Sequence, residues 1–324
     1  MLHLHARLFC SNAQESADLR KPNLLLKDDR LRPLWRILLF ALAFPTLTVA
    51  LWSAYFALIG GARHEPPRLS EEISGEIAEL AAAMITAFWM RRFVDRRSIG
   101  SLGLWLGQPA FRLLWLGIAF GVFMQAVTFG LEAAAGSTRV SGLGALRSDA
   151  GALGYSFVFF LAVACFEELV FRGYLFQNFW EAFGLAPAIV ITSALFAAFH
   201  LYNPNAQANI AQTLAGLLLY AVWACFSMVW TKSLWLAIGA HLAWNFFEGP
   251  VFGFPVSGIV MPFPTLLKQT TGGPTWLTGG AFGPEAGVSS LVALLLGLAV
   301  LAVLARRGVF ADSPDVREAY ARSP

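Results

Sequence analysis

The chain has 324 residues, of which 57% are hydrophobic and 13% are charged, and its formal net charge is +3. A typical soluble domain is about 25% charged, so this composition argues against a soluble protein and predicts an integral membrane protein. The small net charge comes from short basic clusters beside apolar segments, which argues against a nucleic-acid-binding domain because such a domain would present a basic face.

The ends of the chain are polar. Residues 1–33 lack an apolar core followed by a small-residue cleavage site, so no signal peptide is predicted. We expect residues 1–32 to form a cytoplasmic N-terminal tail, 33–311 to form the membrane domain, and 312–324 to form a C-terminal tail. The three cysteines, Cys10, Cys165 and Cys225, are too scattered for a disulfide framework.

The apolar segments predict an all-α fold, a polytopic helical bundle with about eight transmembrane helices, since each crossing needs roughly 20 apolar residues. In chain order the segments are 36–61, 74–92, 112–135, 153–178, 186–202, 208–230, 233–248 and 288–306. The fifth and seventh are short, as expected of helices enclosed by other helices. The second begins amphipathically, so Glu76 and Glu79 should face other helices or the membrane interface.

Basic residues fall mainly on one side of this threading. That side holds the N-terminal segment up to Arg36, the run RRFVDRR at 91–97, Lys232 and Arg306-Arg307. The positive-inside rule therefore predicts that both termini are cytoplasmic. The loop at 249–287 lies on the opposite side, and its Phe, Trp and Leu side chains should pack over the helix ends because water would solvate them poorly.

Two adjacent carboxylates and an arginine interrupt the fourth apolar segment, which reads GALGYSFVFFLAVACFEELVFRGYLFQNF. An ionised side chain at membrane depth costs on the order of 2.5–3.5 kcal/mol, so Glu167, Glu168 and Arg172 indicate a functional site. On a helix, Glu168 and Arg172 share a face at i,i+4 spacing and can pair. The side chain of Glu167 points about 100° around the helix axis from that of Glu168, so it is not needed for the pair with Arg172 and is available for another role.

Two later segments carry polar sites of their own. FAAFH ends at His200, and HLAWN places His241 and Asn245 one helical turn apart on one face. Two imidazoles and a carboxylate can bind zinc. A metal ion and a carboxylate can activate water for attack on a carbonyl, and an amide can donate to the developing oxyanion. These groups together form a candidate hydrolytic site.

Each group also has a structural explanation. A lone buried histidine is usually a core residue, a Glu–Arg pair can clamp helices or line an ion pathway, and an asparagine often joins helices by a hydrogen bond. Their coincidence on three helices within residues 165–250 favours a common site.

The polar runs occur in a recognisable order. EELVFR, FAAFH and HLAWN follow the motifs EExxxR, FxxxH and HxxxN. Through these residues the chain resembles the CPBP family of intramembrane metalloproteases, also called the CAAX protease and bacteriocin-processing (Abi) family, with a motif region of about 153–250. SIGSLGL at 98–104, FGFPVSG at 252–258 and GGAFGPEAG at 279–287 also look like bacterial members.

The resemblance implies roles for the polar residues. Glu167 and Glu168 would activate water, and Arg172 would hold the two glutamates in place. His200 and His241 would assist them or bind a divalent metal ion, zinc, together with Glu167. Asn245 would stabilise the oxyanion.

The resemblance also implies a location and a class of substrate. The enzyme would be an endopeptidase of the bacterial cytoplasmic membrane, and it would cleave a membrane-associated protein or peptide. That substrate could be a prenylated CAAX-type protein, a bacteriocin or a membrane regulator. The resemblance leaves the oligomeric state open.

Two alternatives remain. An ion-coupled transporter would use the Glu, Arg and His side chains as ion sites, and it would have inverted repeats, which the sequence does not display. A non-catalytic immunity or scaffold protein would keep the same residues as structural pairs.

Simple threading places the three sites at different depths. Glu167 lies just past the middle of its segment and His241 near the middle of its own, whereas His200 is close to an outer end. Tilt, a kink or an early helix start is needed to bring them together. Pro204 should end the helix of His200, with the amides of Asn203 and Asn205 at the mouth of the site.

Overall fold

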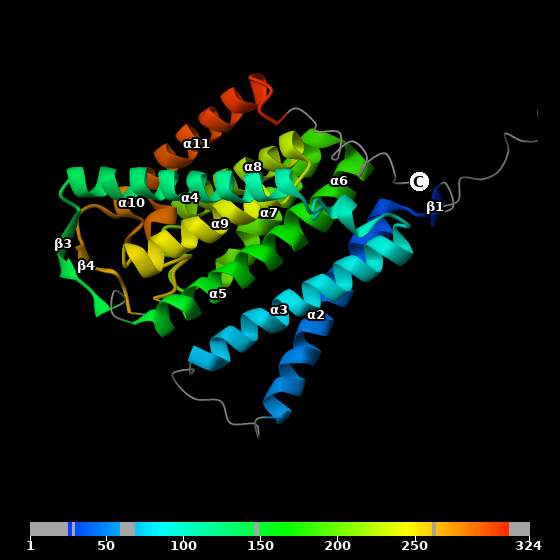
Figure 1. The fold of residues 1–324 in the computed structure, drawn as a ribbon, viewed down its shortest axis with the longest axis horizontal. Coiled ribbons are helices and arrows are strands. Elements are labelled where there is room, and N and C mark those ends of the chain that lie inside the picture. The colour runs from blue at the N-terminus through cyan, green and yellow to red at the C-terminus, as the bar shows by residue number, and fades with distance from the viewer. Residues whose placement is uncertain (1–24, 28–29, 59–68, 146–148, 261–263, 311–324) are drawn as a thin grey trace, which may run out of the picture.

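A computed structural model describes residues 25–27, 30–58, 69–145, 149–260 and 264–310. Most of the two predicted tails, including Cys10, lies outside the described residues. Cys165 and Cys225 are both free thiols, as expected. Among the described residues, seven helices are long and apolar enough to cross a membrane, which confirms the polytopic helical bundle (Figure 1).

The elements follow one another with short connections. In chain order they are β1 (Leu26–Lys27), β2 (Arg30–Leu31), α2 (Pro33–Leu58), α3 (Leu69–Trp89), the π-helix η1 (Met90–Val94), the 3₁₀-helix η2 (Ile99–Leu102), α4 (Gln108–Ala134), β3 (Thr138–Leu143), α5 (Ala150–Glu168), the π-helix η4 (Leu169–Leu175), α6 (Phe176–Phe183), α7 (Leu185–Phe199), the 3₁₀-helix η5 (His200–Tyr202), α8 (Ile210–Thr231), α9 (Trp235–Phe246), the π-helix η6 (Phe247–Val251), β4 (Leu267–Thr271), α10 (Thr275–Thr278), the 3₁₀-helices η7 (Gly280–Phe282) and η8 (Pro284–Ala286), and α11 (Val288–Arg306).

The segment expected at 233–248 is shorter than a full crossing. It forms α9, whose residues 236–245 are all buried, and it packs most extensively against α4. Glycines allow this contact: a Cβ on Gly117 would lie 2.1 Å from the carbonyl oxygen of Leu236, and one on Gly239 would lie 2.2 Å from that of Leu114. Small residues let membrane helices approach closely, so α9 is held as a short central helix.

The segment expected at 153–178 is part of one long helical run. α5, η4 and α6 continue from Ala150 to Phe183 with a π-helical stretch in the middle. Glu167 and Glu168 are the last two residues before that stretch. π-helical turns inside α-helices often mark functional sites, and here the turn directly follows the two carboxylates.

The loop at 249–287 packs over the helix ends, as predicted. β4 pairs with β3 in an antiparallel ribbon that joins Thr138 to Thr271. Phe254, Val256 and Phe282 are buried, and the backbone amide of Gly258 donates to the carbonyl of Phe282 at 2.7 Å. This folded segment forms one wall of the interior described below.

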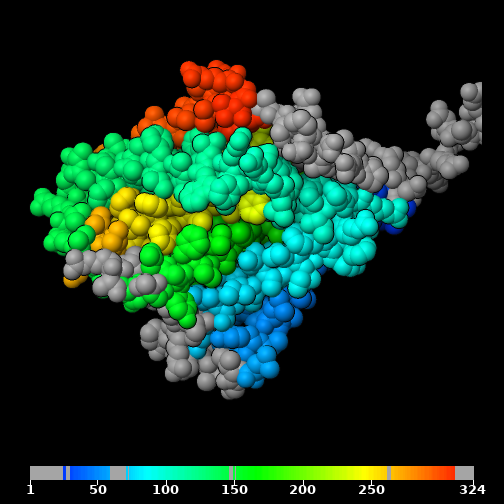
Figure 2. All heavy atoms as spheres, viewed as in Figure 1, coloured from blue at the N-terminus to red at the C-terminus, as the bar shows by residue number. Residues whose placement is uncertain are grey.

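α2 and α3 pack together and form one side of the molecule, visible as the blue and cyan atoms in Figure 2. A buried ionic cluster, not predicted from the sequence, connects them to η4. Asp95 lies 3.1 Å from Arg91 and 3.7 Å from Arg36, and it accepts a hydrogen bond from Tyr174 at 3.1 Å. The cluster holds the helix pair α2 and α3 against the rest of the bundle.

Candidate active site

Three helices bring Glu167, His200 and His241 together. Nε2 of His200 lies 3.8 Å from Oε1 of Glu167, and Nε2 of His241 lies 3.8 Å from Oε2 of the same carboxylate. All three side chains are buried. The predicted convergence of the motif residues is therefore confirmed.

The difference in depth expected from simple threading is absent from the structure, where His200 lies 3.8 Å from Glu167. α7 has only 15 residues and ends at Phe199, and the buried His200 begins η5 directly after it. α5 and α6 form a longer run around Glu167. The short α7 thus carries His200 to the level of Glu167. The helix ends before Pro204, as predicted.

Glu168 is held by three donors on a single oxygen. Its Oε1 accepts hydrogen bonds from Nη1 of Arg172, the hydroxyl of Tyr220 and Nδ1 of His241, each at 3.1 Å. The predicted Glu168–Arg172 pair is confirmed. The guanidinium of Arg172 also lies over the ring of Phe196, 4.5 Å from its centroid. Glu168 and Arg172 are fully buried and cannot meet a substrate directly. The pair therefore positions His241, which contacts Glu168.

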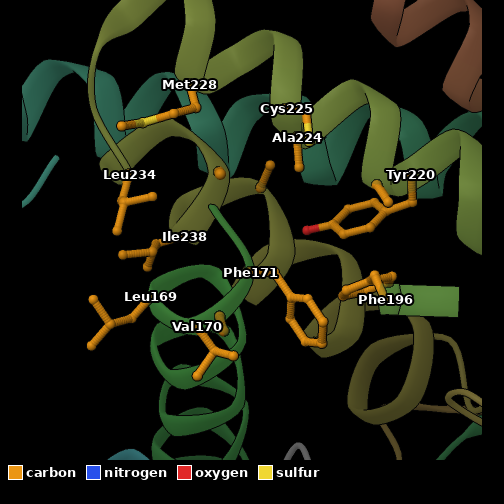
Figure 3. Close-up of a cluster of buried hydrophobic side chains, with 14 of the residues drawn as sticks. Leu169, Val170, Phe171, Phe196, Tyr220, Ala224, Cys225, Met228, Leu234 and Ile238 are labelled. Carbon is orange, nitrogen blue, oxygen red and sulfur yellow. The ribbon is translucent and has the colours of Figure 1, made fainter. Parts of the chain in front are cut away.

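The surroundings of this pair are apolar and aromatic. Figure 3 shows Phe171, Phe196 and Tyr220 grouped near Ala224 and Cys225. Phe171 and Phe196 meet edge to face with ring centroids 5.2 Å apart. Such packing excludes water from the Glu168–Arg172 pair and strengthens its electrostatic interaction.

Glu167 faces an open space. A cavity of about 250 Å³ is lined by Glu167, His200, His241 and Asn245, whereas Glu168 and Arg172 do not line it. Oε2 of Glu167 is buried without a hydrogen-bond partner among the described residues. Glu167 is therefore the carboxylate that a molecule in the cavity would meet.

The two histidine rings are oriented by their Nδ1 atoms. Nδ1 of His200 lies 2.9 Å from the carbonyl oxygen of Phe196, and Nδ1 of His241 lies 3.1 Å from the Glu168 carboxylate. A carbonyl and a carboxylate only accept hydrogen bonds, so Nδ1 is the donor in both rings. Each Nε2 therefore presents a lone pair towards Glu167 when the ring is neutral.

The amide of Asn245 lies on the same face of α9 as His241, as the i,i+4 spacing predicts. One turn after His241, it is buried and lines the same cavity. Asn203 lines the cavity as well and donates to the carbonyl oxygen of Ser257 at 3.0 Å. Asn205 does not line it, because its side chain points to the carbonyl oxygen of Ala281 instead, at 3.5 Å.

Comparison with known families matches the part of the chain that holds these residues. Residues 149–247 match the family model described as type II CAAX prenyl endopeptidase Rce1-like. This segment is therefore similar to CAAX-type proteases. All six motif residues fall inside the match, which confirms the resemblance found from the motifs. Together with the seven apolar helices, the match supports a multi-pass membrane protein of the protease class. No curated protein and no solved structure matches the chain.

The donor types of Glu167, His200 and His241 fit a zinc ion. Zinc prefers imidazole nitrogen and carboxylate oxygen, and histidine ligands usually donate their other N–H to a carbonyl or carboxylate, as His200 and His241 do. In the part of the chain that the structure describes, no three His, Cys, Asp or Glu side chains are grouped closely enough to hold a metal ion. Zinc binding by Glu167, His200 and His241 stays a prediction.

Sequence reasoning missed several residues that line the cavity. Tyr220 of α8, Trp244 of α9, Ser257 and Glu285 all line it. Tyr220 carried a signal, since a buried tyrosine in an apolar helix needs a partner for its hydroxyl. Glu285 lies in a loop whose return over the helices had no local signal. Glu76 and Glu79, expected to face other helices or the membrane interface, line the same cavity.

Proposed function

We propose that the chain is an intramembrane endopeptidase in which Glu167 takes a proton from the water molecule that attacks a peptide carbonyl. One observation carries the proposal: Glu167 faces the cavity between two imidazoles with an oxygen that lacks a hydrogen-bond partner among the described residues. The neighbouring Glu168 does not line the cavity, and its Oε1 accepts three hydrogen bonds. The two glutamates therefore have different roles.

The reaction follows from these positions. The water oxygen bonds to the carbonyl carbon while Glu167 accepts a water proton. The amide of Asn245 donates to the oxygen that becomes negative. The carbon–nitrogen bond then breaks, and the proton held by Glu167 passes to the leaving amine directly or through Nε2 of His200 or His241. The products are a new carboxyl terminus and a new amino terminus.

Glu168, Arg172 and Tyr220 act through His241. The Glu168 carboxylate fixes the Nδ1–H of His241, so Nε2 is kept as an acceptor facing Glu167. A bound zinc ion, if held by Glu167, His200 and His241, would supply Lewis-acid polarisation of the carbonyl. The substrate class we propose is a membrane-associated protein or peptide, because the cavity walls combine these polar groups with Phe159, Phe160 and Phe196.

The proposed location is the cytoplasmic membrane of a bacterium with both termini in the cytoplasm. The connectivity supports this orientation. The run at 91–97 and Lys232 follow the ends of α3 and α8, and Arg306 is the last residue of α11. The positive-inside rule puts such basic clusters in the cytoplasm.

Cleavage of a membrane-inserted peptide by the purified protein in lipid vesicles tests the proposal. Glu167→Gln should lower kcat by about 10²–10⁴-fold, as expected for loss of a general base, without changing the melting temperature. Asp149→Asn is the control, because Asp149 is exposed and caps α5, and asparagine caps equally well. A folded Glu167→Gln protein that cleaves as fast as wild type would contradict the proposal.

A further inference from the structure

The charged side chains that line the cavity are mainly acidic. Four of the described residues that line it are glutamates, Glu76, Glu79, Glu167 and Glu285, and no lysine or arginine is among them. Glu167 belongs to the proposed reaction. The other carboxylates have no part in that reaction, so their presence in the same cavity needs another explanation.

Glu285 is fixed in place by neutral donors. It belongs to η8 in the loop that covers the helix ends, and its Oε2 accepts a hydrogen bond from Ser257 at 2.6 Å while its Oε1 accepts one from Trp244 at 3.3 Å. Its backbone lies tightly on α8, since a Cβ on Gly216 would be 1.8 Å from the Glu285 carbonyl oxygen. The carboxylate is therefore rigidly held, and neither donor carries a charge that would neutralise it.

Glu79 adds a second carboxylate from a different part of the chain. It lies on α3, which packs against α5 beside the cavity. Within the described residues, the ion pairs of lysine and arginine go to Asp95, Glu168 and Glu181 and not to Glu79 or Glu285. Glu167, 5% exposed, also directs an oxygen without a hydrogen bond into this space.

Glu79 and Glu285 lie in a cleft with apolar walls and have no ion pair with lysine or arginine among the described residues. Such carboxylates concentrate a negative potential there. Such a potential attracts cations and repels anions, so it selects substrates by charge. The walls beside these carboxylates include Phe196 and Phe199, against which the methylene stem of a lysine can pack.

We propose that the cavity recognises a substrate with a lysine or arginine side chain next to the cleaved bond, and that Glu285 is the residue that determines this specificity. The inference rests on the proposed function and deepens it. Glu285 supplies a fixed carboxylate for the cationic group, and Glu79 contributes to the same potential. Neither group takes part in breaking the bond.

Binding of three fluorescent apolar peptide amides to the detergent-solubilised full-length protein tests the inference. One carries a single lysine, and its analogues carry norleucine or glutamate at the same position. The lysine peptide should bind about tenfold more tightly than the norleucine peptide, as expected for one charge-assisted contact, and the glutamate peptide should bind most weakly. Glu285→Gln should reduce the preference for lysine to less than about threefold, and Asp149→Asn should leave it unchanged.

The norleucine peptide reports whether Glu285→Gln is folded, because its affinity should not change. Should that variant fail to fold, Glu79→Gln takes its place and should weaken the preference in the same direction. Equal affinity for lysine and norleucine, or a preference that survives in both variants, would overturn the inference. Cleavage of the same peptides is followed in parallel: a lysine preference without any cleavage would overturn the proposed endopeptidase and leave the charge recognition standing.

Discussion

Nδ1 of His241 lies 3.1 Å from Oε1 of Glu168. The second glutamate of the pair is thus the partner of a histidine on another helix. Arg172 and Tyr220 donate to the same oxygen, so one buried carboxylate joins the run of α5 and η4 to α8 and α9. Glu168 and Arg172, which do not line the cavity, can therefore control the orientation of His241, which does.

Tyr220→Phe removes one of the three donors to Glu168 and keeps the aromatic ring. We expect the free energy of unfolding to fall by about 1 kcal/mol and kcat to fall by roughly tenfold, because His241 is held less firmly. Thermal unfolding in detergent and a cleavage assay measure the two effects. Tyr202→Phe is the matched control, since Tyr202 is 94% exposed. Equal activity of the two variants would argue against a positioning role for Tyr220.

Removing one member of the Glu168–Arg172 pair should be more harmful than removing both charges. Arg172→Met leaves a buried carboxylate without its cation and should lower stability by about 3–5 kcal/mol. Combining it with Glu168→Gln should recover part of that loss, since no uncompensated charge remains. Melting temperatures of the two single variants and the double variant give the coupling energy. Strict additivity would show that the two side chains do not act as a pair.

Metal content distinguishes the two forms of the proposed reaction. If Glu167, His200 and His241 bind zinc, the purified protein should hold about one zinc ion per chain, and His200→Ala and His241→Ala should each lower the occupancy. Elemental analysis of the protein in detergent measures this without any activity assay. Zinc that stays at wild-type levels in both variants would place the metal elsewhere.

Gly117 should not tolerate a side chain. A Cβ there would lie 2.1 Å from the carbonyl oxygen of Leu236 on α9, so Gly117→Ala must push α4 and α9 apart and should cost about 1–3 kcal/mol or more. Gly130→Ala on the same helix is the control, because nothing lies within 4 Å of its Cβ position, and alanine should stabilise the helix slightly. Thermal unfolding of the two variants provides the comparison, and similar melting temperatures would contradict the close packing of α9.

Local patterns were enough to predict the helices and the six motif residues. Apolar length marks a membrane helix because the bilayer core has a fixed thickness. A charged residue inside such a segment stands out because its burial is costly. The i,i+4 spacing was also sufficient to pair Glu168 with Arg172, and the structure has that contact.

Only the tertiary structure shows which residues on different helices contact one another, because spacing within one helix does not determine such contacts. That His241 contacts Glu168 through one nitrogen and faces Glu167 through the other depends on how α9 lies against α5. The short α7 sets the level of His200, and the covering loop brings Glu285 into the cavity from far along the chain. Sequence periodicity fixes directions around one helix axis, whereas these contacts depend on the packing of several helices. That packing is set by glycine contacts such as Gly117 against Leu236, which have no local pattern.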